Sequence, residues 1–135
     1  EELVKNELSE KRYSHALLNA IINLYFFKSL KTKKIGLNLT IDWFENQIVD
    51  KSFNYCVAKF FPQVKSKGYM GINADLNVNN FLIPSALEKK FKLCPKEIFL
   101  INNHNKKFFK KVYNSSNIKI APAFRNQKIF RYTMW

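Results

Sequence analysis

The segment 35–61 constrains the fold most, because its hydrophobic residues change their spacing part-way along it. In the stretch IGLNLTIDW every second residue is apolar, which is the spacing of a β-strand with one apolar face. From Gln47 onward the apolar residues recur at helical intervals, and Pro62 marks the stop. The segment therefore predicts a strand followed directly by a helix.

The same two spacings alternate along the rest of the chain. The other predicted elements are helices over 9–30, 85–93 and 106–113 and strands over 65–72, 97–101 and 118–124. Strands that alternate with helices are typical of a mostly parallel sheet with right-handed crossovers. The chain contains neither an internal repeat nor a linker. We therefore expect one Rossmann-like α/β domain over residues 1–135, flanked by helices, and expect it to belong to a larger protein.

The chain is strongly basic, with 23 basic and 10 acidic residues and a net charge of +13. Only three of the basic residues are arginines, and lysine attracts polyanions without the two-point contacts that arginine makes. Nucleic acid, an anionic membrane face and nucleotide-linked substrates all fit this charge, and biased codon usage also explains it. No apolar run reaches the ~18 residues of a membrane span, so we expect a cytoplasmic protein.

Candidate site residues lie just beyond the predicted strands, because ligands of open α/β sheets bind outside the carboxyl ends of the strands. The candidates form four sets of residues, one for each predicted strand. The sets lie far apart in the sequence and are predicted to converge on one crevice. They are Glu45, Asn46 and Gln47 after the first strand, Tyr69 and Gly71 within the second, 102–104 after the third, and 123–125 with Arg125 after the fourth.

Several of these residues have both a chemical and a structural interpretation. Partial burial would raise the pKa of Glu45 and suit it to acid–base chemistry, or Glu45 and Asn46 would cap the helix. Asp50 and Lys51 would form a structural ion pair across the crevice, or Asp50 would stabilise the helix N-terminus. His15 would act as a base or ligand contact, or would be a half-buried residue of the first helix.

The remaining candidates are a glycine, an arginine and two cysteines. Gly71 would let the backbone approach a ligand. Arg125 would clamp a phosphate or carboxylate, or would lie on the surface. Cys56 and Cys94 have no further ligands at zinc spacing, so we expect no metal and interpret both as small buried hydrophobes in a reducing compartment. Neither GxGxxG nor GxxxxGK[ST] occurs in the chain.

The stretch WFENQIVDKSFNYCVAKFFPQVKSKGYMG resembles a segment of bacterial surface-carbohydrate biosynthesis proteins, which act in capsule and lipopolysaccharide assembly and look like GT-B-type glycosyltransferases. Their pattern of W-F-E-N-Q, D-K, a proline and G-Y-Q-G is matched at 43–47, 50–51, Pro62 and 68–71. PSALE, CPKEIFLIN and APAFR are similar to later pieces of the pattern, and the resemblance spans roughly residues 12–126. Met70 replaces a glutamine of the pattern, and Asn102 and Ala121 replace glycines.

The resemblance implies a sugar transferase of two Rossmann-like domains, of which this chain would be mostly the N-terminal, acceptor-side domain. Glu45 would then act as a base or stabilise positive charge at the sugar carbon, and Asn46 and Gln47 would bind hydroxyls. Tyr69 would line the acceptor pocket, and Arg125 would face phosphate or an acidic sugar.

The partners implied are a nucleotide sugar and a glycan or lipid-linked acceptor, with no cofactor. Because no DxD-type acid cluster is present, we expect no metal requirement. The lysines would hold the protein at the anionic inner face of the membrane. Two alternatives stay open: a basic nucleic-acid-binding module, which is the less favoured partner class, and a non-catalytic relic of the fold.

Overall fold

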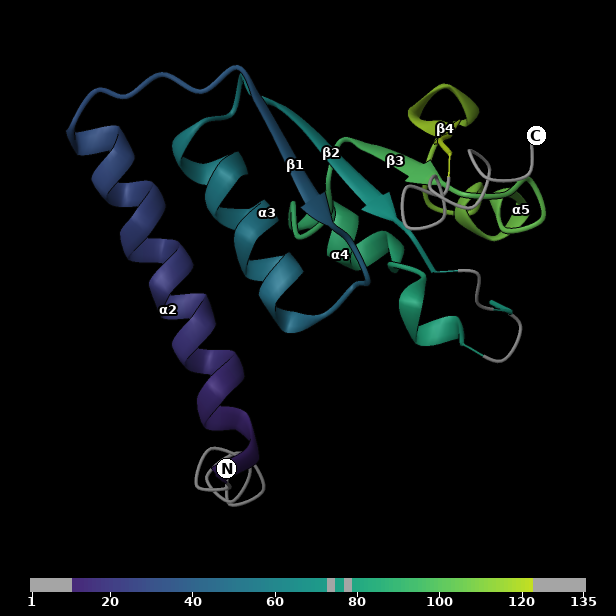
Figure 1. The fold of residues 1–135 in the computed structure, drawn as a ribbon, viewed down its shortest axis with the longest axis horizontal. Coiled ribbons are helices and arrows are strands. Elements are labelled where there is room, and N and C mark those ends of the chain that lie inside the picture. The colour runs from purple at the N-terminus through teal and green to yellow at the C-terminus, as the bar shows by residue number, and fades with distance from the viewer. Residues whose placement is uncertain (1–10, 73–74, 77–78, 123–135) are drawn as a thin grey trace, which may run out of the picture.

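The computed structural model describes residues 11–72, 75–76 and 79–122, and it confirms the predicted α/β class (Figure 1). Every predicted helix and strand is found, most of them somewhat shorter than predicted. The elements in chain order are α2 Lys11–Thr32, β1 Leu39–Trp43, α3 Ile48–Phe60, β2 Lys65–Met70, the 3-10 turn Asn80–Leu82, α4 Ala86–Lys90, β3 Glu97–Leu100, α5 Lys106–Phe109, the 3-10 turn Ser115–Asn117 and β4 Ile118–Ile120.

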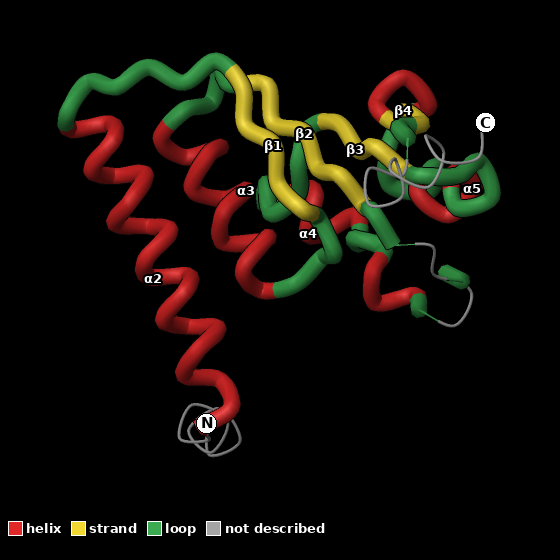
Figure 2. Tube along the Cα trace, viewed as in Figure 1, coloured by secondary structure: helices red, strands yellow, loops and turns green. Residues whose placement is uncertain are grey.

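The four strands form one parallel sheet in the order β1-β2-β3-β4, so each strand pairs with the next one along the chain. Right-handed crossovers that all step in the same direction place their helices on the same face of a sheet. Accordingly α3, α4 and α5 connect the strands on one side, and α2 lies beside α3, beyond the β1 edge of the sheet (Figure 2). Among the described elements, no helix covers the opposite face.

The hydrophobic core lies between the sheet and the connecting helices. Its fully buried side chains include Ile98 and Leu100 from β3 and Phe109 from α5. A second cluster, with Phe27 and Val57 at its centre, joins α2 to α3. Burial of each such side chain contributes about 1.5–3 kcal/mol, so the helix-covered face supplies most of the stability of the sheet.

Strand β1 directs its apolar residues away from this core. Ile41 is 64% exposed and Trp43 is 37% exposed, whereas the intervening Asp42 points toward α3 and accepts a hydrogen bond from Asn54 Nδ2 at 2.7 Å. The alternation in the sequence identified the strand but not which face would be buried. We call the uncovered side the open face. By strand register and alternation it consists of Leu39, Ile41, Trp43, Lys65, Lys67, Tyr69, Glu97, Phe99 and Lys119.

Helix α2 is longer than the helix it packs on. Its 22 residues span ~33 Å, against ~20 Å for the 13 residues of α3. Phe27 is buried against α3, but Leu17 and Ile21, nearer the N-terminus, are exposed although their spacing matches the same apolar stripe. None of the helices in the described part of the chain combines the length and the apolar character that crossing a bilayer needs.

Candidate functional site

A tight turn at the carboxyl end of β1 carries most of the predicted site. Phe44 continues the strand pairing by one residue, because its N–H donates to the Tyr69 carbonyl at 3.0 Å. Asn46 then adopts a φ of 58°, in the left-handed region that asparagine tolerates better than most residues. One carboxylate oxygen of Asp50 accepts the backbone N–H groups of Glu45 at 2.8 Å and Gln47 at 3.1 Å. These bonds fix the turn onto the start of α3.

Two further contacts tie the turn to the segment before and within α4. The buried Asn46 donates from Nδ2 to the Phe81 carbonyl at 2.9 Å. The ion pair of Lys51 is with Glu88, at 2.6 Å, and Glu88 also accepts the Ser85 N–H at the start of α4. Two separate motifs of the sequence, WFENQIVDK and PSALE, are therefore in direct contact in the structure.

The local electrostatics fit these structural roles. Burial raises the pKa of Asp50, although the two backbone N–H groups that it accepts act in the opposite direction. Burial also opposes ionisation of Glu88, but the hydrogen bonds from Lys51 and Ser85 outweigh it and hold the pKa of Glu88 below its usual range. Asp50 thus completes the capping box of α3, in which Gln47 is the N-cap residue, and Lys51 joins α3 to α4.

Glu45 lies at the centre of a small cluster on the open face. Its two carboxylate oxygens accept hydrogen bonds from the Trp43 indole N–H and from Gln47 Nε2, the latter at 3.1 Å. The Trp43 ring meets the Tyr69 ring edge-on, with 5.3 Å between centroids. A methyl group at Gly71 would lie 2.2 Å from the Trp43 ring, so only glycine leaves room for the indole there. We call Trp43, Glu45, Gln47, Tyr69 and Gly71 the Trp43 cluster.

A pocket of about 360 Å³ extends from this cluster across the open face. Its floor is aromatic and its rim is basic: the ammonium groups of Lys67 and Lys119 lie 5.3 and 5.8 Å from the centre of the Phe99 ring. The Tyr69 hydroxyl donates to the Pro122 carbonyl at 2.8 Å, which brings the chain after β4 to the pocket wall. The lining residues are Ile41, Lys67, Tyr69, Phe99, Ile120, Ala121 and Pro122.

The other predicted residues lie elsewhere. His15 is exposed on α2, ~12 Å along the helix axis from Asn23, the residue that bonds to the start of α3. His104 is exposed in the loop after β3 and packs against the Phe108 ring. Arg125 lies outside the described residues. The structure therefore brings together Glu45, Gln47, Tyr69 and Gly71, fixes Asn46 beneath them, and leaves His15 apart.

The strand order also bears on the predicted crevice. Crevices in open α/β sheets form where the strand order reverses, because the connections on either side of that point then lie on opposite faces. The four described strands run in chain order without a reversal. The candidate site is accordingly a pocket on the open face next to the carboxyl ends of β1 and β2.

Two polar residues on the covered face were not among the sequence candidates. Burial raises the pKa of Asp42 to about 7; the hydrogen bond from Asn54 opposes this shift and the negative charge of Asp50 adds to it. Asn54 is only 2% exposed. The signal in the sequence was the acid Asp42 among the alternating apolar residues of β1. Its partner Asn54 lies twelve residues away on α3, and only the three-dimensional structure shows that the two side chains meet.

No protein-family model matches the chain, and comparison with curated proteins and with solved structures also gives no match. Within the described ranges, no three His, Cys, Asp or Glu side chains come together in a way that could hold a metal ion.

Proposed function

We propose that the chain is a glycosyltransferase-like domain that takes part in moving a sugar from a nucleotide donor to a hydroxyl of a glycan or lipid-linked acceptor. The observation that carries the proposal is the placement of Glu45. Its carboxylate is oriented by Trp43 and Gln47 beside the carboxyl ends of two parallel strands, where ligands of α/β sheets bind.

The residues around Glu45 suit a sugar and a phosphate. The exposed ring of Trp43, packed against the largely buried ring of Tyr69, offers apolar surface to the face of a sugar, and Gln47 offers an amide to its hydroxyls. Lys67, on the rim of the adjoining pocket, attracts the negative charge of a donor diphosphate.

In the proposed reaction the acceptor hydroxyl oxygen forms a bond to the anomeric carbon of the donor sugar. The bond between that carbon and the diphosphate oxygen breaks, and its electron pair leaves with the nucleoside diphosphate. Glu45 takes the proton of the attacking hydroxyl as general base, a role that typically accelerates a reaction by 10²–10⁴-fold.

The test measures release of nucleoside diphosphate from a panel of nucleotide sugars, with glycan acceptors present, for the wild type and Glu45→Gln. Donor binding is first ranked by thermal shift. We expect the Glu45→Gln rate to fall about 100-fold or more. The matched control is Glu97→Gln, which removes an acid of β3 that pairs with Lys119 at 2.8 Å. A Glu45→Gln protein as fast as the wild type, or no release from any donor, would refute the proposal.

A nucleic-acid-binding module is the second candidate, and one observation favours it. The open face presents Phe99 between the ammonium groups of Lys67 and Lys119, and such interleaving of rings and cations suits single strands. This alternative requires the affinity for a single-stranded oligonucleotide to fall steeply between about 50 and 200 mM salt. It also requires Phe99→Ala to weaken binding by about 1–3 kcal/mol.

A further inference from the structure

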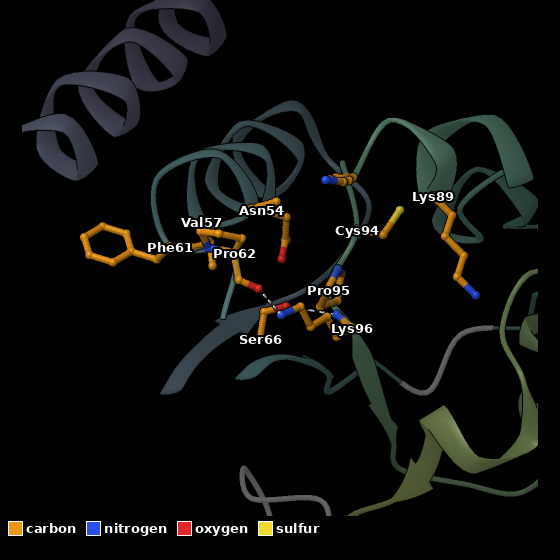
Figure 3. A pocket seen from close by; sticks show the side chains of 11 residues that line it. Asn54, Val57, Phe61, Pro62, Ser66, Lys89, Cys94, Pro95 and Lys96 are labelled. Atoms are coloured by element: carbon orange, nitrogen blue, oxygen red, sulfur yellow. Dashed lines mark hydrogen bonds between the residues drawn. The ribbon is translucent and has the colours of Figure 1, made fainter. Parts of the chain in front are cut away.

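A second pocket, of about 210 Å³, lies on the helix-covered side of the sheet (Figure 3). Its walls come from the second half of α3, from Pro62 and Ser66 around the start of β2, and from the connection between α4 and β3. It therefore lies near the amino ends of β2 and β3, away from the Trp43 cluster. The lining residues are Asn54, Val57, Ala58, Phe61, Pro62, Ser66, Lys89, Lys92, Cys94, Pro95 and Lys96.

Asn54 supplies a buried acceptor that points into this pocket. Its Nδ2 donates to Asp42 Oδ2 at 2.7 Å and to the Asp50 carbonyl at 2.9 Å, and these two acceptors fix the orientation of the amide. Its Oδ1 is consequently directed away from them, is buried and has no hydrogen-bond partner among the described residues. Figure 3 shows this oxygen directed from α3 into the pocket. Because an unsatisfied buried acceptor costs about 1–3 kcal/mol, a ligand that donates a hydrogen bond would be favoured here.

The pocket is also positively charged. Three lysines line it, and no acid is among the lining residues. Lys96 Nζ donates to the carbonyls of Pro62 at 2.6 Å and Val64 at 2.7 Å, which holds one ammonium group at the wall with one N–H remaining. Lys89 Nζ donates to the Val112 carbonyl at 2.7 Å, so its stem rather than its charge lines the pocket. Lys92, exposed at the rim, adds a second positive charge beside Lys96.

We propose that this pocket binds a small phosphorylated polyol, with a hydroxyl donating to Asn54 Oδ1 and the phosphate facing Lys96 and Lys92. The volume of about 210 Å³ lies below the roughly 300–1,000 Å³ of most small-molecule pockets, which suits a three-carbon polyol phosphate better than a nucleotide. The apolar walls formed by Val57, Phe61 and Pro95 match the carbon chain. The site is independent of the proposed transfer reaction, since it shares no residue with the Trp43 cluster.

The test is a titration of the ¹⁵N-labelled chain with glycerol 3-phosphate, followed by NMR through the Asn54 side-chain amide and the backbone signals of Ser66 and Lys96. We expect saturable shifts at these three residues below about 10 mM ligand. Inorganic phosphate should bind at least about fivefold more weakly, because it places no polyol hydroxyl against Asn54, and glycerol should produce no saturable shift.

Lys92→Gln should weaken binding of glycerol 3-phosphate about three- to tenfold. The matched control is Lys90→Gln, which changes an exposed lysine at the end of α4, two residues before Lys92 and outside the pocket, and should leave binding unchanged. Both lysines are exposed, so neither change endangers folding. The proposal is overturned by shifts that do not saturate, by equal affinity for inorganic phosphate, or by an unchanged affinity in Lys92→Gln. Loss of transferase activity in Glu45→Gln would leave this result unaffected, so the two proposals fail separately.

Discussion

Replacement of Asp42 by asparagine should make the protein more stable at neutral pH and remove a specific part of its pH dependence. Asp42 points from β1 toward α3, where its Oδ2 accepts a hydrogen bond from Asn54. Its Oδ1 is buried and has no hydrogen-bond partner in the part of the chain that the structure describes. Burial raises the pKa of this carboxyl from 3.8 to about 7. An asparagine side chain keeps an oxygen for Asn54 and carries no charge to bury.

The sign and size of the effect follow from proton linkage. Between pH 4 and 7 the folded protein holds a proton on Asp42 that the unfolded chain has lost. Raising the pH through this window therefore removes stability from the wild type, and above pH 7 the contribution is constant. From pH 5 to the folded-state pKa is about two pH units, which at 1.36 kcal/mol per unit gives about 3 kcal/mol.

The assay is urea unfolding of the wild type and Asp42→Asn at pH 5 and pH 8, followed by far-UV circular dichroism. From pH 5 to pH 8 the unfolding free energy of the variant should increase by about 3 kcal/mol relative to that of the wild type. For an m-value of about 2 kcal/mol/M, this corresponds to a relative shift of about 1.5 M in the urea concentration at the unfolding midpoint. Asp75→Asn, at an exposed position, should show no such growth. Parallel pH dependence of the wild type and Asp42→Asn would refute the reasoning.

Two further predictions concern packing and charge. Gly71→Ala should destabilise the fold by about 1–3 kcal/mol and change the Trp43 fluorescence, because its methyl group would lie 2.2 Å from the indole. The control Gly36→Ala, whose added methyl group meets no atom of the described residues within 4 Å, should leave both the stability and the fluorescence unchanged. Equal effects of the two changes would show that Trp43 is not held against Gly71. A double-mutant cycle of Lys51→Met and Glu88→Gln, measured by urea unfolding, should give a coupling free energy of about 0.2–1 kcal/mol, because both side chains are partly exposed. A coupling free energy near zero at low salt would mean that the ion pair does not stabilise the contact between α3 and α4.

Much of the fold could be predicted because it is local. The change of hydrophobic spacing between 35 and 61 indicated β1 and α3, and Pro62 marked the end of the helix within two residues. The placement of Asp50 near a helix start indicated its capping role, since a carboxylate there meets free backbone N–H groups in any protein. These features depend on residues a few positions apart, so the sequence displays them directly.

The candidate site was only partly predictable because its contacts are long-range. Glu45 and Tyr69 were candidates by position. Trp43, which connects them, was assigned to the apolar side of a strand and matched the W-F-E-N-Q pattern, but no site role was predicted for it. The partner of Lys51 is Glu88, thirty-seven residues away, rather than a neighbour in the first turn of α3. The spacing within one segment carries no information on such pairs.

The sequence by itself determined that strands and helices alternate, that the sheet is parallel, and where the turn after β1 begins, because hydrophobic period, proline and capping residues act over a few positions. Only the tertiary structure decided which side of the sheet is covered. Four strands in chain order place their crossovers on one face, so β1 directs Ile41 and Trp43 to the open side and Asp42 toward α3. That sidedness depends on the handedness and order of all the crossovers together, and it sets both the position of the Trp43 cluster and the raised pKa of Asp42.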